Sequence, residues 1–214
     1  MATEAQILRL TQWLSPAFPI GAFAWSHGLE AALNEDQVTA DTVEDWLRGV
    51  LTLGGGWADA VLLAAAYRAK PSEVSEVDAI ARAMAPSAER LAETLEQGTA
   101  FARTVSDVWP GGRLPALCYP VALGHAGALH DLPLDLTATL YLQAFAAALT
   151  SAASRLVPLG QTHAQAILSR LTELCPEVAK SALSIPLDEI SSQSFAADIA
   201  AMRHETQYSR LFRS

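Results

Sequence analysis

The sequence predicts an all-α protein, a single-domain helical bundle of about eight to ten helices with no significant sheet. Apolar residues recur at spacings of three and four along nearly every segment, and the helix-favouring residue types Ala, Leu, Glu and Arg are abundant. No segment alternates between polar and apolar residues as a half-buried strand does. Hydrophobic residues make up 51% of the chain and charged residues 17%, which favours a buried core over disorder.

Proline and glycine divide the N-terminal part of the chain into helices. The prolines within residues 15–21 end a first helix and force a turn, after which a second helix is expected over residues 22–33. Asp41 or Thr42 can cap a third helix, because both side chains accept hydrogen bonds from the free N–H groups of a first turn. The three glycines at residues 54–56 stop that helix.

Helical spacing continues through the rest of the chain. The loop over residues 110–115, rich in proline and glycine, is the clearest interruption. Neither side of this loop carries enough core to fold alone, so we expect one domain. The remaining helices are expected from about Trp57 to the break at Pro71 and over residues 73–85, 87–109, 120–129, 136–154 and 158–174, with Pro176 and Pro186 marking later breaks.

Two of these helices have features that concern packing. Gly124 and Gly127 leave little side-chain bulk within residues 120–129, which lets another helix approach closely. Residues 136–154 carry no charge, and their length would suffice to cross a membrane. Their Ser, Thr and Gln residues and their many alanines weaken membrane insertion, so we expect a buried central helix instead.

Charge and cysteine content exclude several classes of protein. The formal net charge of −9 repels phosphate backbones, so nucleic-acid binding is not expected. The two cysteines, Cys118 and Cys175, are too few for a disulfide framework and are typical of buried thiols in a reducing compartment. The first residues lack the pattern of a signal peptide. We therefore expect a cytoplasmic protein without membrane attachment.

The reactive residue types do not form a recognisable active site. The five histidines are scattered, and no CxxC pair, HExxH helix, GxSxG elbow or P-loop occurs. We therefore expect no catalytic, cofactor-binding or metal-binding residues. His27 and Glu30 lie three apart on an expected helix, and surface hydrogen bonding is the simplest role for such a pair. The acidic runs at residues 73–78 and 89–96 are interpreted as solvated helix faces.

Two segments suggest binding instead. Residues 15–30 combine a rigid turn with aromatic residues and Gly28, which costs about 1 kcal/mol inside a helix unless close packing requires it. Residues 199–214 carry three arginines and one glutamate, a local charge of +2, whereas residues 1–198 sum to −11. Helical spacing gives these last residues a basic and an aromatic stripe, which suggests docking onto a partner. We expect a helical domain over residues 1–198 and a partner-docking tail, residues 199–214, of the same domain.

Three stretches resemble the hallmark sequences of the UreF family: SPAFPIGAFAWSHGLE (residues 15–30), RLVPLGQTHAQ (155–165) and DIAAMRHETQYSRLFRS (198–214). They occur in the family's order and span essentially the whole chain. The resemblance implies an all-α homodimer that is not an enzyme and holds no cofactor. It also implies a urease accessory protein, required for maturation of the urease nickel metallocentre. Such a protein is a scaffold that binds UreD/UreH, recruits and regulates the GTPase UreG, and helps deliver nickel to apo-urease.

The resemblance also assigns residues, since the family's C-terminal segment becomes ordered on binding UreD/UreH. The partner-binding residues are then Arg203, His204, Glu205, Tyr208, Arg210, Leu211, Phe212 and Arg213. The residues that match the family motifs are Pro19, Gly21, Trp25, Ser26, Gly28, Glu30, Gln161, Thr162 and Gln165. The last three could equally cap a helix N-terminus. Trp25 stands where tyrosine is common, which puts in doubt any anchoring of the tail through a phenolic hydrogen bond.

Two alternative functions remain open. A helical enzyme with an apolar small-molecule pocket requires a deep cavity in which titratable groups converge. A self-sufficient nickel metallochaperone requires one tight nickel site in each monomer.

Overall fold

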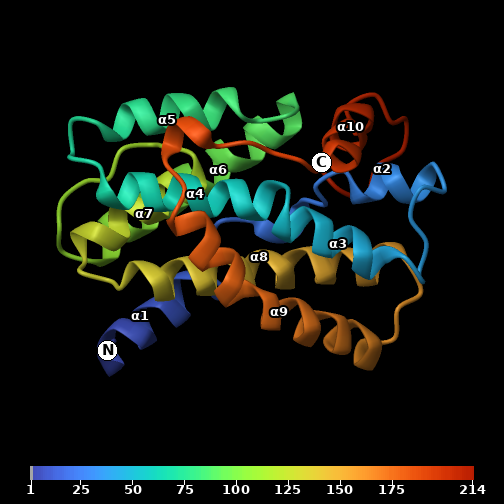
Figure 1. Ribbon diagram of the computed structural model, residues 1–214, viewed down its shortest axis with the longest axis horizontal. Helices are drawn as coiled ribbons and strands as arrows, with labels where there is room; N and C mark the ends of the chain where they lie inside the picture. Colours follow the sequence, from blue (N-terminus) through green and yellow to red (C-terminus); the bar gives the residue numbers. More distant parts are fainter. Residues whose placement is uncertain (1) are drawn as a thin grey trace.

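The computed structural model describes residues 2–214 and confirms the all-α fold class (Figure 1). No strand occurs in the described residues, and the number of α-helices agrees with the prediction. The α-helices are α1 (Glu4–Trp13), α2 (Leu29–Asn34), α3 (Val43–Thr52), α4 (Gly55–Arg68), α5 (Val74–Ala83), α6 (Ala88–Val108), α7 (Tyr119–Leu129), α8 (Leu134–Leu156), α9 (Gln161–Leu183) and α10 (Phe195–His204). Two short 3-10 helices, η1 (Ala22–Ala24) and η2 (Leu187–Glu189), lie between them.

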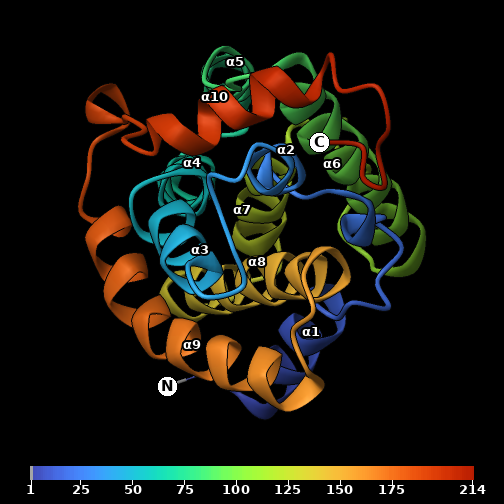
Figure 2. The same cartoon turned by 90° about the vertical axis from the view of Figure 1, so that its right-hand side faces the viewer.

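Helices α4 and α7 form the centre of the bundle. Figure 2 shows them enclosed by α5 and α10 on one side, α6 on another, and α8 and α9 below. Helix α4 is buried around most of its circumference, which explains why residues such as Val61, Leu62 and Leu63 are consecutive and apolar. Helices α8 and α9 are joined by a short loop and pack as an antiparallel pair.

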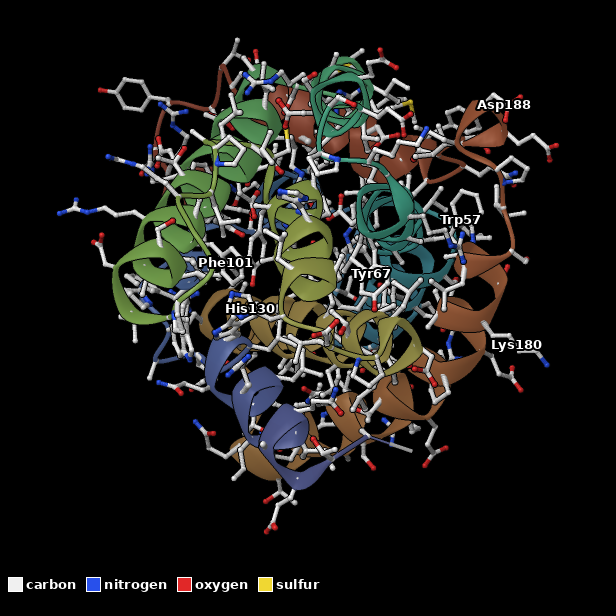
Figure 3. All side chains as sticks on the ribbon, turned by 90° about the vertical axis from the view of Figure 1, so that its left-hand side faces the viewer. Trp57, Tyr67, Phe101, His130, Lys180 and Asp188 are labelled. Carbon is white, nitrogen blue, oxygen red and sulfur yellow. The ribbon has the colours of Figure 1, made fainter. Side chains whose placement is uncertain are left out.

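An aromatic cluster fixes α1 to the bundle. Phe101 points from α6 into the interior, and His130 follows α7 close to α1 (Figure 3). The ring of Trp13 lies edge-on to both, with centroid separations of 5.3 Å to Phe101 and 5.3 Å to His130. Trp13 and Phe101 are fully buried, so these contacts hold α1 at the end of the molecule away from α10.

Polar side chains begin some helices as the sequence suggests. Ser87 accepts the backbone N–H of Arg90 at 3.1 Å and so caps α6. Thr42 is the residue before α3, but its side chain accepts the N–H of Thr39 at 2.9 Å and makes no capping bond to the helix. Thr42 therefore occupies the predicted capping position, but the predicted hydrogen bond from its side chain to the first turn of α3 is not made.

The predicted helix over residues 22–33 is wrong, because the chain breaks before Leu29. Gly28 has φ +75° and His27 has φ +55°, both in the left-handed region that a right-handed helix excludes. A Cβ on Gly28 would lie 2.5 Å from the backbone nitrogen of Ala201 in α10. Glycine is thus required here for close packing and for its backbone conformation, and it precedes a helix instead of lying within one.

The break expected at Pro176 is also wrong, because α9 continues through this proline to Leu183. Proline removes one backbone N–H and leaves the carbonyl of residue 172 without its helical partner. Pro176 is exposed, so water can reach this part of the helix, while its neighbour Cys175 is fully buried. Packing of the buried face holds the helix together against the local preference of proline.

The close helix approach predicted at Gly124 is confirmed. A Cβ built on Gly124 in α7 would lie 2.2 Å from the carbonyl oxygen of Leu63 in α4. This distance is far below van der Waals contact, so the two backbones meet only because the side chain is absent. The pairing of α4 with α7 at the centre of the bundle depends on it.

Two stretches are long and apolar enough to be considered as membrane spans, Val43–Arg68 and Leu134–Leu156. Both belong to the bundle, and within the most apolar 18-residue window of each, 61% of the first and 50% of the second is buried inside the protein. The first is interrupted between α3 and α4, and the second is α8, which contains the uncharged residues 136–154 that were expected to form a central helix. The apolar character of both segments is therefore explained by packing within the protein.

We expect Gly124→Ala to lower the free energy of unfolding by about 1–3 kcal/mol, because the added methyl group overlaps the α4 backbone. Gly49→Ala is the matched control, since a Cβ at this position in α3 meets no atom within 4 Å. The control should raise stability by up to about 1 kcal/mol through helix propensity. Urea denaturation measures both. Equal effects of the two substitutions would contradict the close approach of α4 and α7.

Candidate functional site

The last part of the chain folds back onto the bundle. Residues 205–214, which we call the tail segment, leave α10 and run toward α2 and α6 (Figure 2). Helix α10 ends at His204, so the predicted helical stripes over residues 203–212 do not form. The backbone N–H groups of Leu211 and Phe212 donate to another element instead of to helical carbonyl groups.

The carboxylate of Glu30 binds the backbone of the tail segment. Its two oxygens accept the backbone N–H groups of Leu211 at 2.7 Å and of Phe212 at 2.8 Å. The Nε2 atom of His204 lies 3.3 Å from the same carboxylate. Glu30 is only 6% exposed, so its charge is compensated by these donors and not by water.

The segment before α2 adds main-chain bonds to the tail segment. The N–H of Ser26 donates to the carbonyl oxygen of Ser214 at 2.8 Å, and the hydroxyl of Ser26 donates to the same oxygen. The N–H of Arg213 donates to the carbonyl of Ala24 at 2.9 Å. The first and last motif segments, almost 190 residues apart in sequence, therefore form one site.

The acidic face of α6 binds the basic residues of the tail segment. Glu89 lies 2.7 Å from Nδ1 of His204 and accepts a bond from Arg210 at 2.5 Å. Glu96 accepts two bonds from the guanidinium of Arg213, at 2.6 and 2.7 Å. Such two-pronged pairing fixes orientation as well as distance. The tail segment is thus held by carboxylates from α2 and α6.

The interpretation of the two acidic runs as solvated faces is wrong for residues 89–96, and in the run over residues 73–78 it is wrong for Asp78, whereas Glu76 is exposed and Glu73 is partly exposed. In the run over residues 89–96 the carboxylates bind the tail segment or lie buried beneath it. In the run over residues 73–78, Asp78 is buried and accepts the N–H of Cys118 at 2.6 Å. The sequence did contain a signal, since Glu89, Glu93 and Glu96 repeat at helical spacing opposite in charge to the tail arginines.

Two aromatic rings complete the anchoring. Phe212 is 4% exposed, and the guanidinium of Arg155 lies 4.2 Å from its ring centroid. Trp25 is 3% exposed and carries the guanidinium of Arg213 at 4.4 Å. Both arrangements are cation–π contacts. The doubt raised by Trp25 is resolved for this chain, because the ring anchors the tail segment without a phenolic hydroxyl.

A buried charged cluster lies beneath the tail segment. Nε2 of His27 lies 3.0 Å from Glu93 and 2.8 Å from Nη1 of Arg90. The charge of Arg90 and the hydrogen bonds of the cluster overcome burial and hold the pKa of Glu93 at about 2. Burial, with the nearby Arg90, lowers the pKa of His27. The expected surface pair of His27 and Glu30 is therefore wrong, since each is buried and bonded to different groups.

Asp59 forms a second polar group at the start of α4. It accepts the hydroxyl hydrogen of Tyr141 at 2.7 Å and lines a small cavity of about 60 Å³ together with Arg90 and Asp198. Burial raises the pKa of Asp59 to about 6, against the opposing charge of Arg90. Sequence reasoning did not find this group, because nothing in the local pattern distinguishes Asp59 from an ordinary first-turn carboxylate.

The remaining motif residues lie apart from the tail segment. Pro19 is exposed, and Gly21 has φ +74° in the turn before η1. Gln161, Thr162 and Gln165 are exposed at the beginning of α9, where Gly160 precedes the helix and no side chain caps it. Their interpretation as helix caps is therefore wrong. Arg155 of the same motif does reach the site, since it donates to the carbonyl of Phe23 at 2.6 Å.

The geometry of the site favours binding over bond-making. Most of its carboxylates are occupied by arginine, histidine or backbone donors. Among residues 2–214, no three His, Cys, Asp or Glu side chains lie close enough together to hold a metal ion. What the site offers chemically is a hydrogen-bonded surface of mixed charge and aromatic groups.

Comparison with known proteins gives consistent matches. A family model described as UreF matches residues 38–172. The chain is 52% identical to the urease accessory protein UreF of Roseobacter denitrificans, covering 100% of this chain and 96% of that protein. It is 50% identical to the urease accessory protein UreF of Ruegeria pomeroyi, with 99% and 98% covered. The protein of that name from Rhodopseudomonas palustris is 44% identical, with 100% and 95% covered.

We expect Glu30→Gln to destabilise the protein by about 2–3 kcal/mol, because the amide group cannot accept both N–H groups of residues 211 and 212. Amide hydrogen exchange should show loss of protection at Leu211 and Phe212. Glu35→Gln is the control, since Glu35 pairs with Arg203 at the surface and should cost less than about 1 kcal/mol. Unchanged protection in Glu30→Gln would contradict the role given to this carboxylate.

The pKa of Asp59 leads to a pH-dependent expectation. The folded-state pKa of about 6 lies above the ordinary value of 3.8, so the folded protein binds the proton more tightly. The contribution of Asp59 to the free energy of unfolding should therefore fall as pH rises from about 4 to about 6. Asp59→Asn removes this loss while keeping an acceptor for Tyr141. We expect the variant to match the parent near pH 4 and to exceed it by about 1–2 kcal/mol at pH 7, as measured by urea denaturation. Parallel pH profiles would contradict this account.

Proposed function

We propose that this chain, which belongs to the UreF family of urease accessory proteins, is a scaffold for maturation of the urease nickel metallocentre. Its relatives are named accessory proteins, and the chain is accordingly an accessory protein and not an enzyme. The scaffold binds UreD/UreH, recruits and regulates the GTPase UreG and helps deliver nickel to apo-urease. Its contribution is positional, since it brings the components together by binding.

One observation carries the proposal: the tail segment is held by hydrogen bonds and ion pairs and displays apolar side chains outward. Tyr208 is fully exposed and Leu211 is 65% exposed, although its own N–H is bonded to Glu30. We propose that UreD/UreH binds this displayed surface.

Helix α10 extends the same surface. Phe195, Ile199 and Met202 recur at spacings of four and three, which places them on one face of the helix. They are 69%, 48% and 51% exposed, while Ala197, Ala200 and Ala201 on the other face are buried. Exposed apolar anchors at this spacing are typical of a helix that docks into a partner's groove.

The eight proposed partner-binding residues divide into two groups by orientation. His204 and Phe212 are buried, and Arg213 is paired with Glu96, so they position the segment. The others are exposed: Arg203, Glu205, Tyr208, Arg210 and Leu211. Of these, Arg203 and Arg210 are paired with Glu35 and Glu89, and Glu205 accepts the N–H of Ala88, so Tyr208 and Leu211 are the side chains most available to a partner. We assign the motif residues Trp25, Ser26, Gly28 and Glu30 to support of the segment.

The finer parts of the proposal follow from family membership. We propose a cytoplasmic homodimer in which residues 1–198 form the helical domain and residues 199–214 the docking tail of that domain. Pro19, Gly21, Gln161, Thr162 and Gln165 belong to exposed or partly exposed motif surfaces and are proposed to contact other components of the assembly. Nickel is the cargo of the assembled complex in this proposal.

The two alternatives make different demands. The enzyme alternative requires titratable groups that converge on a cavity, and a cavity of about 310 Å³ does reach His27 and Glu93. These two groups are paired with one another and with Arg90, and the relatives are named accessory proteins.

The metallochaperone alternative is tested by equilibrium dialysis of the purified chain with nickel, where one tight site per monomer would favour it.

We expect the double substitution Tyr208→Ala and Leu211→Ala to weaken co-purification with UreD/UreH by at least about tenfold, because both exposed side chains are lost as anchors. Leu8→Ala is the matched control, since Leu8 is 64% exposed on α1 at the opposite end of the bundle. All variants should unfold at the same temperature as the parent. Full retention of UreD/UreH by the double variant would refute the proposed surface.

A further inference from the structure

A separate cavity lies between the N-terminal turn and α8. It has a volume of about 310 Å³, opens to the surface, and is lined by residues of the segment 14–25 and of α6, α7 and α8. The tail segment does not line it. For comparison, an apolar protein cavity of about 150 Å³ holds one benzene molecule. The volume is therefore suited to a molecule about the size of two fused rings.

The walls of this cavity are mainly apolar. Three aromatic rings follow one another along one side, with centroid separations of 5.7 Å from Tyr119 to Tyr141 and 6.4 Å from Tyr141 to Phe145. Small residues of α8, including Ala144 and Ala148, leave space on another side. Aromatic walls favour a flat aromatic ligand, through edge and stacking contacts.

One polar group in the cavity is left without a partner. Tyr119 is 7% exposed, and within the described chain its hydroxyl makes no hydrogen bond; only its backbone N–H is paired, with Thr94. Burial alone raises the pKa of this hydroxyl, so it stays protonated and can donate. The hydroxyl oxygen is not one of the fully enclosed polar atoms without a partner, so it is accessible to a molecule that enters the cavity. Neighbouring Tyr141 is different, because its hydroxyl already donates to Asp59.

The two charged or titratable groups that reach the cavity, Glu93 and His27, are already paired with other groups of the protein. Glu93 is bonded to Arg90, His27, Gln97 and the hydroxyl of Ser214, so the acceptor sites of its carboxylate are already used. His27 is engaged by Arg90 and Glu93. A ligand in the cavity therefore meets mainly apolar walls, the Tyr119 hydroxyl and the neutral side chains of Ser15, Gln143 and Ser151, and charge on the ligand would be desolvated without compensation.

We propose that this cavity is a binding site for a neutral, flat organic molecule of bicyclic size whose single hydroxyl or carbonyl oxygen accepts the Tyr119 hydroxyl proton. The site is distinct from the tail segment, and the inference does not rest on the proposed function. Binding is expected to be modest, because one hydrogen bond and the burial of two rings supply its free energy.

The test uses the purified full chain and two probes, 2-naphthol and naphthalene, which differ by one hydroxyl group. Titrations followed by protein NMR shifts give the affinity of each. Tyr119→Phe removes only the unpaired hydroxyl. Ala148→Leu fills the cavity, and Ala196→Leu on the exposed face of α10 is its matched control.

We expect Tyr119→Phe to weaken 2-naphthol binding about fivefold, the equivalent of one neutral hydrogen bond, and to leave naphthalene binding unchanged. Ala148→Leu should abolish binding of both probes, whereas Ala196→Leu should bind both as the parent does. Thermal unfolding should show that Tyr119→Phe is as stable as the parent, since no protein contact is lost. The proposal is overturned if the parent binds neither probe, if Ala148→Leu binds normally, or if Tyr119→Phe affects both probes equally.

Discussion

The carboxylate of Glu30 is the contact on which the candidate site depends. It accepts two consecutive backbone N–H groups of the tail segment and faces His204, and it does so almost without access to water. A buried charge is stable only when donors surround it, so the carboxylate and the tail segment require one another. The conformation of the last ten residues therefore depends on Glu30 of α2.

The backbone before α2 brings Glu30 to this position. The left-handed conformations of His27 and Gly28 turn the chain sharply, so that α2 begins directly against α10. Any side chain at residue 28 would collide with the backbone of Ala200 and Ala201. A glycine that would weaken a continuous helix thus becomes the residue that allows two short helices to meet.

Internal pairing also explains the uneven charge of the chain. The positive tail and the strongly negative body are partners within one molecule, because Glu89 and Glu96 bind Arg210 and Arg213. The positive charges of the tail segment are therefore paired with carboxylates of the same molecule. What remains for another protein is chiefly apolar, namely Tyr208, Leu211 and the exposed face of α10. This division links the packing of the tail segment to a function based on association.

The sequence by itself determined the all-helical class and most helix boundaries, because helical periodicity and the conformational limits of proline and glycine act locally. It also determined the close approach at Gly124, which follows from the missing side chain, and the family, which follows from the motif residues themselves. Only the tertiary structure decided that residues 22–33 are not one helix, that α9 passes through Pro176, and that the acidic face of α6 is covered. The unpaired Tyr119 hydroxyl and the raised pKa of Asp59 likewise arise from neighbours distant in sequence. Glu30 and Leu211 are 181 residues apart, and no local pattern specifies such a pairing. Burial, which sets the free energy of each polar group, exists only once the helices have packed.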